Sequence, residues 1–242
     1  LLVLAAGLTV MYQYAQEPPA VHKPLSIGHR GSDLGVENTL EAVKGAIDSG
    51  ADFAEVDIQL TKDQVPVAAH DDNLSRMAGR FKNINSLTLE ELQSISLSQY
   101  GMEGQVPTLE ELLTLSKGKI RLLIELKAVS GKEREILVDQ ILALIERYDF
   151  EKDCILMSLD FDLIQLVRQK NPALKTGCCM FGNLGKTTVE DLLSLDCDFV
   201  VIEENMVSNS FISACRQAWL PVYVWTVDLE ENMRKYLDMG VN

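Results

Sequence analysis

The sequence is short of positive charge. Its 242 residues include 22 Lys and Arg against 36 Asp and Glu, which gives a formal net charge of −14 at pH 7. This balance argues against a broad basic surface of the kind that binds nucleic acid or an anionic membrane. Any anion that the protein binds must therefore be held by a local group of cations.

Cysteine is also scarce, and aromatic residues make up only 6% of the chain. The five cysteines are an odd number and include no C-x-x-C pair, which excludes a zinc ribbon and a complete disulfide framework. We expect most of them to be small core residues, with at least one unpaired thiol if the domain lies outside a membrane. Hydrophobic residues, at 47%, suffice for a sizeable core, so the composition is that of a globular protein.

The N-terminal segment lacks charge up to Glu17, but its apolar stretch, 1–12, is shorter than the ~20 residues that span a bilayer. We interpret it as the end of a transmembrane anchor, with Tyr12 and Tyr14 at the membrane interface. A signal peptide is the first alternative, although no small-x-small cleavage site follows the apolar stretch. A buried core helix is the second.

Prolines stiffen the segment that follows, 17–24, so it is interpreted as an extended linker. We therefore assign residues 1–24 to the anchor and linker, and residues 25–242 to one folded domain. No internal repeat or second domain is visible in that range.

Short β-rich runs alternate with amphipathic helical patterns from Leu25 onward, which is typical of a parallel sheet with crossover helices. Only residues 61–64 separate the second and third runs, too few for a parallel crossover, so these two runs are expected to form an antiparallel hairpin. The other seven runs, each followed by a helix, predict a TIM (β/α)8 barrel whose final strand lies beyond residue 242. The strand candidates are Ser26–His29, Phe53–Leu60, Val65–Ala69, Arg121–Lys127, Ile155–Leu159, Lys175–Met180, Phe199–Glu203 and Val222–Val227.

Two helices begin with a capping-box pattern, in which a polar cap residue precedes an acidic residue by three positions. Asn38 with Glu41 precedes one apolar helical pattern, and Thr108 with Glu111 precedes another. We expect Asn38 and Thr108 to be helix N-caps.

Carboxylates gather near the ends of two predicted strands. Glu55 and Asp57 share one face of the second strand at period two, and Glu125 lies at the matching place on a later one. The carboxyl ends of barrel strands form the reactive mouth, where packed carboxylates repel one another unless a cation holds them. A divalent cation, Mg²⁺ or Ca²⁺, bound by these three residues explains the pattern. The alternative is exposed acids that form salt bridges with Lys127 or Arg30.

Histidine is rare, with three residues in the chain. His29 ends the first strand and His70 ends the hairpin, while His22 lies in the linker and is expected to be a solvated spectator. A lone histidine is more often a core or surface residue, but two at one mouth suit a general acid and base near neutral pH.

Arg30 and Lys127 bring cations to the same mouth. Arginine forks onto phosphate oxygens and lysine supplies a point charge, so these two with a metal describe a pocket for a phosphoryl group. Phosphodiester cleavage, with metal electrostatics and a histidine acid–base pair, is the reaction class that follows.

Short motifs follow one another along the chain: His29-Arg30-Gly31, Glu37-Asn38-Thr39, Glu55-x-Asp57, Thr61-Lys62-Asp63, His70-Asp71, Pro107-Thr108-Leu109-Glu110-Glu111, Glu125-Leu126-Lys127 and Trp225-Thr226-Val227. In order and spacing, over residues 26–242, they resemble the glycerophosphodiester phosphodiesterase family. The resemblance implies a barrel enzyme of glycerol and lipid metabolism that hydrolyses glycerophosphodiesters to glycerol 3-phosphate and an alcohol.

The resemblance also implies roles for individual residues. His29 and His70 are the expected catalytic pair, Glu55, Asp57 and Glu125 the metal ligands, and Arg30 and Lys127 the phosphate contacts. Glu37 is expected to support the metal site, and Trp225 to form a wall of the substrate pocket or, alternatively, to be a buried barrel residue.

The chain departs from the family pattern at three places. Gln64 stands where relatives usually have glycine in the hairpin turn, Leu159 replaces a frequent phenylalanine in the pocket wall, and the closing Thr-Asp segment would follow Asn242. Some bacterial members carry a membrane-embedded N-terminal region. We therefore expect a membrane-anchored bacterial type whose catalytic domain faces outward.

Several alternatives stay open at this point. A histidine activates the attacking water, or the glycerol 2-hydroxyl attacks first and gives a cyclic phosphate. A lysophospholipase-D-like activity on lipid or polyglycerol-phosphate substrates is the alternative within the same chemistry. A catalytically silent ligand-binding barrel and a sugar-phosphate isomerase are alternatives of other classes.

Overall fold

The structure is a computed structural model that describes residues 24–129, 131–182 and 188–242. The predicted anchor and nearly all of the linker lie outside the described residues. Among the helices that are described, none is long and apolar enough to cross a membrane.

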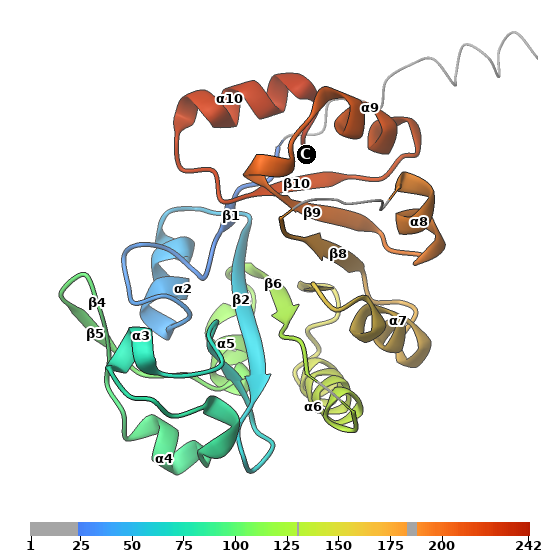
Figure 1. Cartoon of the computed structure of the whole chain (residues 1–242). Coiled ribbons are helices and arrows are strands. Elements are labelled where there is room, and N and C mark those ends of the chain that lie inside the picture. The colour runs from blue at the N-terminus through green and yellow to red at the C-terminus, as the bar shows by residue number, and fades with distance from the viewer. Residues whose placement is uncertain (1–23, 130, 183–187) are drawn as a thin grey trace, which may run out of the picture.

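Seven parallel strands form an arc at the centre of the molecule, in the order in which they follow along the chain (Figure 1). Each strand pairs in parallel with the next, and the hydrogen-bonded path runs from β1 at one end to β10 at the other. The seven are β1 (Ile27–Gly28), β2 (Phe53–Leu60), β6 (Arg121–Leu126), β7 (Cys154–Ser158), β8 (Thr176–Met180), β9 (Phe199–Glu203) and β10 (Val222–Trp225). The prediction of an eighth strand beyond residue 242 stays a prediction.

Among the described residues, helices cover the outside of this arc (Figure 1). They are α2 (Leu40–Asp48), α5 (Leu109–Ser116), α6 (Glu133–Arg147), α7 (Phe161–Lys170), α8 (Val189–Ser194), α9 (Asn209–Gln217) and α10 (Glu230–Met239). The capping box of Thr108 with Glu111 is confirmed at the start of α5. The prediction for α2 is wrong, because its N-cap is Thr39 and not Asn38.

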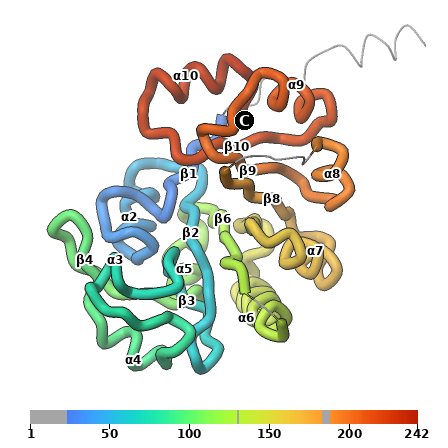
Figure 2. Tube along the Cα trace, viewed as in Figure 1, coloured from blue at the N-terminus to red at the C-terminus, as the bar shows by residue number. Residues whose placement is uncertain are grey.

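Between β2 and α5, residues 61–108 form an excursion from the barrel. The strand β3 (Pro66–Ala68) returns antiparallel to β2, with Pro66 opposite Leu60, and short elements follow it. Figure 2 traces this excursion in turquoise and green beside α2. It has a small apolar core of its own around Leu74, Ile84 and Leu92. The elements that the sequence did not predict here are α3 (Ser75–Ala78), η1 (Ile84–Ser86), α4 (Leu89–Gln93), β4 (Leu97–Gln99) and β5 (Met102–Gly104).

Two apolar layers lie on the two faces of the sheet. The larger packs the sheet against the helices, with Val56, Leu122 and Ile141 among its members. The smaller fills the space inside the arc with Phe53, Leu123, Met157, Cys179, Phe199 and Val201. All five cysteines are buried and unbridged, as the prediction of core thiols requires.

Strand alternation places the charged residues directly above this inner layer. Phe53, Glu55 and Asp57 share one face of β2, and Leu123 shares a face of β6 with Glu125. Along β2 and β6, the inner face of the sheet therefore changes from apolar to acidic toward the carboxyl end. The carboxylates thus lie above an apolar layer that excludes water.

Candidate active site

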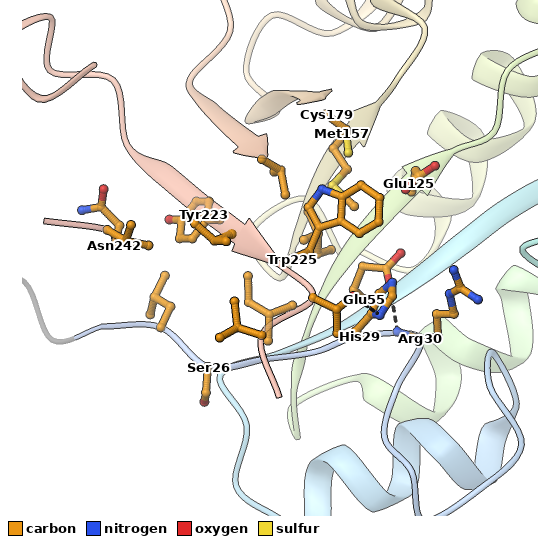
Figure 3. A pocket seen from close by; sticks show the side chains of 18 of the residues that line it. Ser26, His29, Arg30, Glu55, Glu125, Met157, Cys179, Tyr223, Trp225 and Asn242 are labelled. Carbon is orange, nitrogen blue, oxygen red and sulfur yellow. Dashed lines mark hydrogen bonds between the residues drawn. The ribbon is translucent and has the colours of Figure 1, made fainter. Parts of the chain in front are cut away.

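The carboxyl ends of the strands open into a cavity of about 530 Å³. Side chains from β1, β2, β6 and β10, and from the loops that follow strands, converge there (Figure 3). Every site residue predicted from the sequence except Glu37 lines it: His29, Arg30, Glu55, Asp57, His70, Glu125, Lys127 and Trp225.

The three predicted metal ligands come together in this cavity. Asp57 of β2 lies directly opposite Glu125 of β6 in the strand register, and Glu55 is two residues earlier on the same face. One oxygen of each carboxylate lies within 4.8 Å of the others, and all three residues are buried. The pairing register of two neighbouring strands is thus sufficient to bring the three carboxylates close together.

The acidic cluster carries more negative charge than its surroundings balance. Burial raises the pKa of Glu55 well above its ordinary value, and the neighbouring Asp57 and Glu125 raise it further. The pKa of Glu125 is also raised, by burial and then by Asp57. One oxygen of Glu55, Oε1, is buried and has no hydrogen-bond partner among the described residues. An unpaired carboxylate oxygen in a buried group of three acids fits a divalent cation.

Lys127 and Arg30 compensate part of this charge. Lys127 Nζ donates to Asp57 Oδ1 at 3.2 Å and to Glu125 Oε1 at 2.9 Å. Burial would lower the pKa of Lys127, but these two carboxylates outweigh it and raise the pKa. The backbone N–H of Arg30 donates to Glu55 Oε2 at 2.7 Å, the contact drawn in Figure 3. The salt bridges considered as the alternative exist, but they leave Glu55 Oε1 unpaired.

The two histidines enter the cavity with different partners. His29 Nδ1 lies 3.1 Å from the hydroxyl of Thr226, whereas His70 Nδ1 lies 2.7 Å from Asp71 Oδ1. Burial, and then the nearby guanidinium of Arg30, lower the pKa of His29 to about 4. With each Nδ1 engaged, Nε2 is the ring nitrogen left for a ligand.

The β2–β3 pair fixes the place of His70. The N–H of Ala69 donates to the carbonyl of Asp57 at 2.9 Å, so the chain returns to the strand end that carries the carboxylates. The side-chain amide of Gln59 fixes the backbone on either side of His70, because it donates to the carbonyls of Ala69 and Asp71.

Glu37 lies outside the group of carboxylates that could share a cation. Its Oε1 accepts from Arg30 at 3.0 Å and from Arg76 at 2.6 Å, and its Oε2 accepts from Arg76 at 2.8 Å and from Gln99 at 3.0 Å. Burial opposes ionisation, but the arginines hold the pKa of Glu37 below its ordinary value. Glu37 was expected to support the metal site, but both of its oxygens accept hydrogen bonds from other side chains, and it lies apart from the three carboxylates that could hold a cation.

Some residues that hold the site were not found by sequence reasoning. The Asn38 amide donates to Asp57 Oδ2 at 2.8 Å and accepts from the Asp57 N–H at 2.9 Å. Arg76 and Gln99 hold Glu37, and Thr226 contacts His29. A sequence signal existed for three of these residues, because the motifs that contain the predicted site residues also contain Asp71, Asn38 and Thr226. No such signal existed for Arg76 and Gln99, because their contacts with Glu37 depend on the fold of the excursion.

Most of the remaining wall of the cavity is apolar. It includes Leu123, Met157, Leu159 and Val201, as well as Trp225. The Trp225 ring lies 6.0 Å from the ring of His29 and stacks on Phe181 at the same centroid distance, so it bounds the cavity beside a predicted catalytic residue.

Comparison with known proteins gives a consistent result. Residues 29–242 match the model of the glycerophosphoryl diester phosphodiesterase family. YhdW of Bacillus subtilis, provisionally named a glycerophosphodiester phosphodiesterase, is 32% identical in an alignment that covers 89% of this chain and 91% of YhdW. The lysophospholipase D GDPD3 of Homo sapiens is 29% identical in an alignment that covers 66% of this chain and 55% of that protein.

Solved structures agree with these relatives. A phosphodiesterase from Oleispira antarctica, in complex with the product sn-glycerol-3-phosphate, superposes with a TM-score of 0.83 at 25% identity, over 90% of each chain. A glycerophosphodiester phosphodiesterase from Thermotoga maritima superposes with a TM-score of 0.74 at 27% identity, over 90% of this chain and 92% of that one.

Proposed function

The chain belongs to the glycerophosphoryl diester phosphodiesterase family, and from this premise we propose that it hydrolyses glycerophosphodiesters to glycerol 3-phosphate and an alcohol. It is an enzyme of the phosphoric diester hydrolase class and has the TIM-barrel fold of its relatives. One observation carries the choice of substrate: two histidines, three carboxylates, an arginine and a lysine meet in one cavity with an apolar wall. Such a cavity can hold a charged phosphodiester beside a small carbon skeleton.

Glu55, Asp57 and Glu125 would hold one divalent cation, Mg²⁺ or Ca²⁺. When bound, the cation would neutralise the cluster and withdraw electron density from the phosphoryl oxygens. The unpaired Glu55 Oε1 and the raised pKa values of Glu55 and Glu125 support this assignment.

Arg30 and Lys127 would contact the remaining phosphate oxygens. Both line the cavity beside the carboxylates, and the pKa of Lys127 is raised, which keeps its ammonium charged. The guanidinium of Arg30 lies near Asp57, with Nε 3.7 Å from Oδ2, so Arg30 would reach a phosphate that is bound beside the acidic cluster.

The histidines would divide the proton transfers. Burial and then the neighbouring guanidinium of Arg30 favour the neutral ring of His29, so it would accept a proton from water or from the glycerol 2-hydroxyl. His70 has a carboxylate partner at Nδ1, which orients its ring, so it would donate a proton to the leaving alcohol. The antiparallel β2–β3 pair would serve to bring His70 to the mouth.

Release of glycerol 3-phosphate from glycerophosphocholine tests this function. We expect activity in the full chain, loss of activity with a chelator, and a drop of about 100-fold or more in His29→Ala and His70→Ala. Full activity in either variant would contradict the acid–base roles. Trapping a cyclic phosphate would favour attack by the glycerol 2-hydroxyl, and incorporation of labelled water oxygen with no cyclic species formed would exclude it.

A lysophospholipase-D-like activity is the second candidate. The apolar wall around Leu159 and Trp225 favours it, since an acyl-bearing glycerol needs apolar contact beside the phosphate. The relative GDPD3 carries that activity in its name. Comparing release of choline from lysophosphatidylcholine and from glycerophosphocholine decides between the two substrates.

The cellular setting belongs to the proposal as well. We propose that residues 1–24 join the catalytic domain to a membrane and that the domain faces outward, toward glycerophosphodiesters from lipids or polyglycerol-phosphate polymers. The uncharged, apolar start of the sequence supports an anchor. Cleavage of the domain by protease added to intact cells is the expected result, and protection would contradict this orientation.

A further inference from the structure

Arg76 lies outside the cavity but binds two acids beside it. Its Nε donates to Asp71 Oδ2 at 2.7 Å, while Nη1 and Nη2 donate to the two oxygens of Glu37 at 2.8 and 2.6 Å. Nη1 and Nη2 thus make a bidentate contact with the carboxylate of Glu37, while Nε contacts the carboxylate of Asp71. Arginine is the side chain that offers donors in this arrangement.

Both acids lead directly to site residues. Asp71 Oδ1 contacts His70 Nδ1 at 2.7 Å, and Glu37 Oε1 accepts from Arg30 Nη1 at 3.0 Å. An unbroken path of charge-assisted hydrogen bonds therefore joins a predicted catalytic ring to a predicted phosphate contact, and Arg76 is its middle member. Charge-assisted bonds of this kind are short and directional, so each link restricts the next.

The backbone beneath Arg76 is itself held in place. Leu74, two residues before Arg76, donates its N–H to the carbonyl of Lys82 at 3.0 Å, and the Asn73 side chain accepts from the N–H of Ser75 at 2.9 Å. Arg76 is thus fixed on the excursion, whereas Glu37 and Arg30 belong to the loop after β1. The guanidinium connects two segments that are far apart in the sequence.

We propose that Arg76 is a positioning residue for the hydrolysis: through Asp71 it fixes the ring of His70, and through Glu37 it fixes the guanidinium of Arg30. Arg76 does not line the cavity, so it is not expected to touch the substrate. A purely structural role is the competing explanation. The side chain of Arg76 is 44% exposed, and ion pairs at such exposure usually contribute little to stability.

Kinetics of the full chain on glycerophosphocholine test the proposal, which rests on the proposed function. We expect kcat of Arg76→Gln to fall about 10- to 100-fold, because small displacements of a catalytic group have costs of this size. Arg76→Lys should fall as well, since an ammonium keeps the charge but cannot make the fork. KM should rise in both variants because Arg30 loses its support.

Arg168→Gln is the matched control. Arg168 also binds two carboxylates, those of Asp196 and Asp198, but it lies on α7 and outside the cavity. We expect kcat and KM of this variant to equal those of the wild type. Thermal unfolding followed by circular dichroism should show that Arg76→Gln and Arg168→Gln stay folded at the assay temperature.

A double-mutant cycle gives a readout that a structural role would not move. We expect Arg76→Gln and Asp71→Asn to be non-additive in kcat, since both break the path to His70, while Arg76→Gln and Arg168→Gln should be additive. Added guanidinium ion should restore part of kcat in Arg76→Ala.

Two results would overturn the proposal: full kcat in Arg76→Gln, or an additive cycle with Asp71→Asn. If Arg76→Gln does not fold, Arg76→Lys decides in its place, and full kcat in that variant counts against the proposal. A wild-type chain without activity would instead refute the proposed function, and the role of Arg76 would fall with it.

Discussion

Asp57 and Glu55 differ in how firmly they are held, although they share one strand face. Both oxygens of Asp57 have donors, Lys127 Nζ on one side and the Asn38 amide on the other. Glu55 has a single donor, the N–H of Arg30, and one unpaired oxygen. Asp57 is therefore fixed by the protein, whereas Glu55 keeps an oxygen for a ligand.

Removal of the Asn38 amide should weaken the fold and the site together. In Asn38→Gly the buried Asp57 loses a donor to its carboxylate and an acceptor for its N–H, so we expect the free energy of unfolding to fall by about 1–3 kcal/mol. Asn38 has a φ of 60°, so Asn38→Ala adds a backbone strain of about 1–2 kcal/mol, of which the smaller freedom of alanine in the unfolded chain offsets about 0.5–1 kcal/mol. Asn38→Ala should therefore be the less stable of the two variants. Urea unfolding of both variants measures this, and equal stability of the two would contradict the strain.

Asp71 should make stability depend on pH in the acid range. The hydrogen bond from Arg76 holds the pKa of Asp71 at about 2, below its ordinary value of 3.8. A carboxyl whose pKa is lowered by folding stabilises the fold above its ordinary pKa, and this contribution disappears as the pH falls through the folded value. The difference in unfolding free energy between wild type and Asp71→Asn should therefore shrink as the pH falls from about 4 to about 2. A difference that does not change over this range would count against the ion pair.

At the scale of the elements, periodicity predicted the long strands and most helices because each has a buried face. The boundaries of β2 and β9 match the predicted ranges. Asn38 was mistaken for a helix cap because its partner, Asp57, lies 19 residues away, and a local motif cannot show such a contact. The strands β4 and β5 have three residues each and little apolar alternation, so they gave no signal.

In the candidate site too, residues brought together by strand pattern could be predicted from the sequence, whereas contacts that depend on the wider fold could not. Glu55, Asp57 and Glu125 could be predicted because strand alternation and register alone bring them together. The contacts of Glu37 with Arg76 and Gln99 required the fold of the excursion, which the sequence did not predict.

The turn between β2 and β3 contains a strained residue. Gln64 has a φ of 63°, in the left-handed region that favours glycine. Gln64→Gly removes a strain of about 1–2 kcal/mol but adds freedom to the unfolded chain, so we expect a net stabilisation of up to about 1 kcal/mol. Gln64→Val should be destabilising, because a β-branched residue tolerates positive φ poorly. Unfolding midpoints of the two variants should move in opposite directions, and a shift in the same direction would contradict the turn geometry.

At the scale of the whole molecule, the candidate site holds three carboxylates that repel one another above an apolar layer. Phe53 and Leu123 exclude water below Glu55, Asp57 and Glu125, so the acids repel one another across a medium that screens poorly. The net charge of −14 adds to this repulsion. A bound divalent cation should therefore stabilise the entire fold, a property that is measurable without substrate.

Thermal unfolding with added cation and with chelator measures this coupling. At a free cation concentration of about 100 times Kd, the stabilisation should be ~2.7 kcal/mol. Glu55→Gln should lose the response, and it leaves the partners of Asp57 intact. Without cation this variant should be more stable than the wild type, since it removes one of three repelling carboxylates, so the order of stability should reverse when cation is added. Glu230→Gln on α10, whose carboxylate pairs with Arg234 at the surface, should respond like the wild type. An equal response in Glu55→Gln would contradict the metal assignment, and the larger shift with Mg²⁺ or with Ca²⁺ would identify the cation.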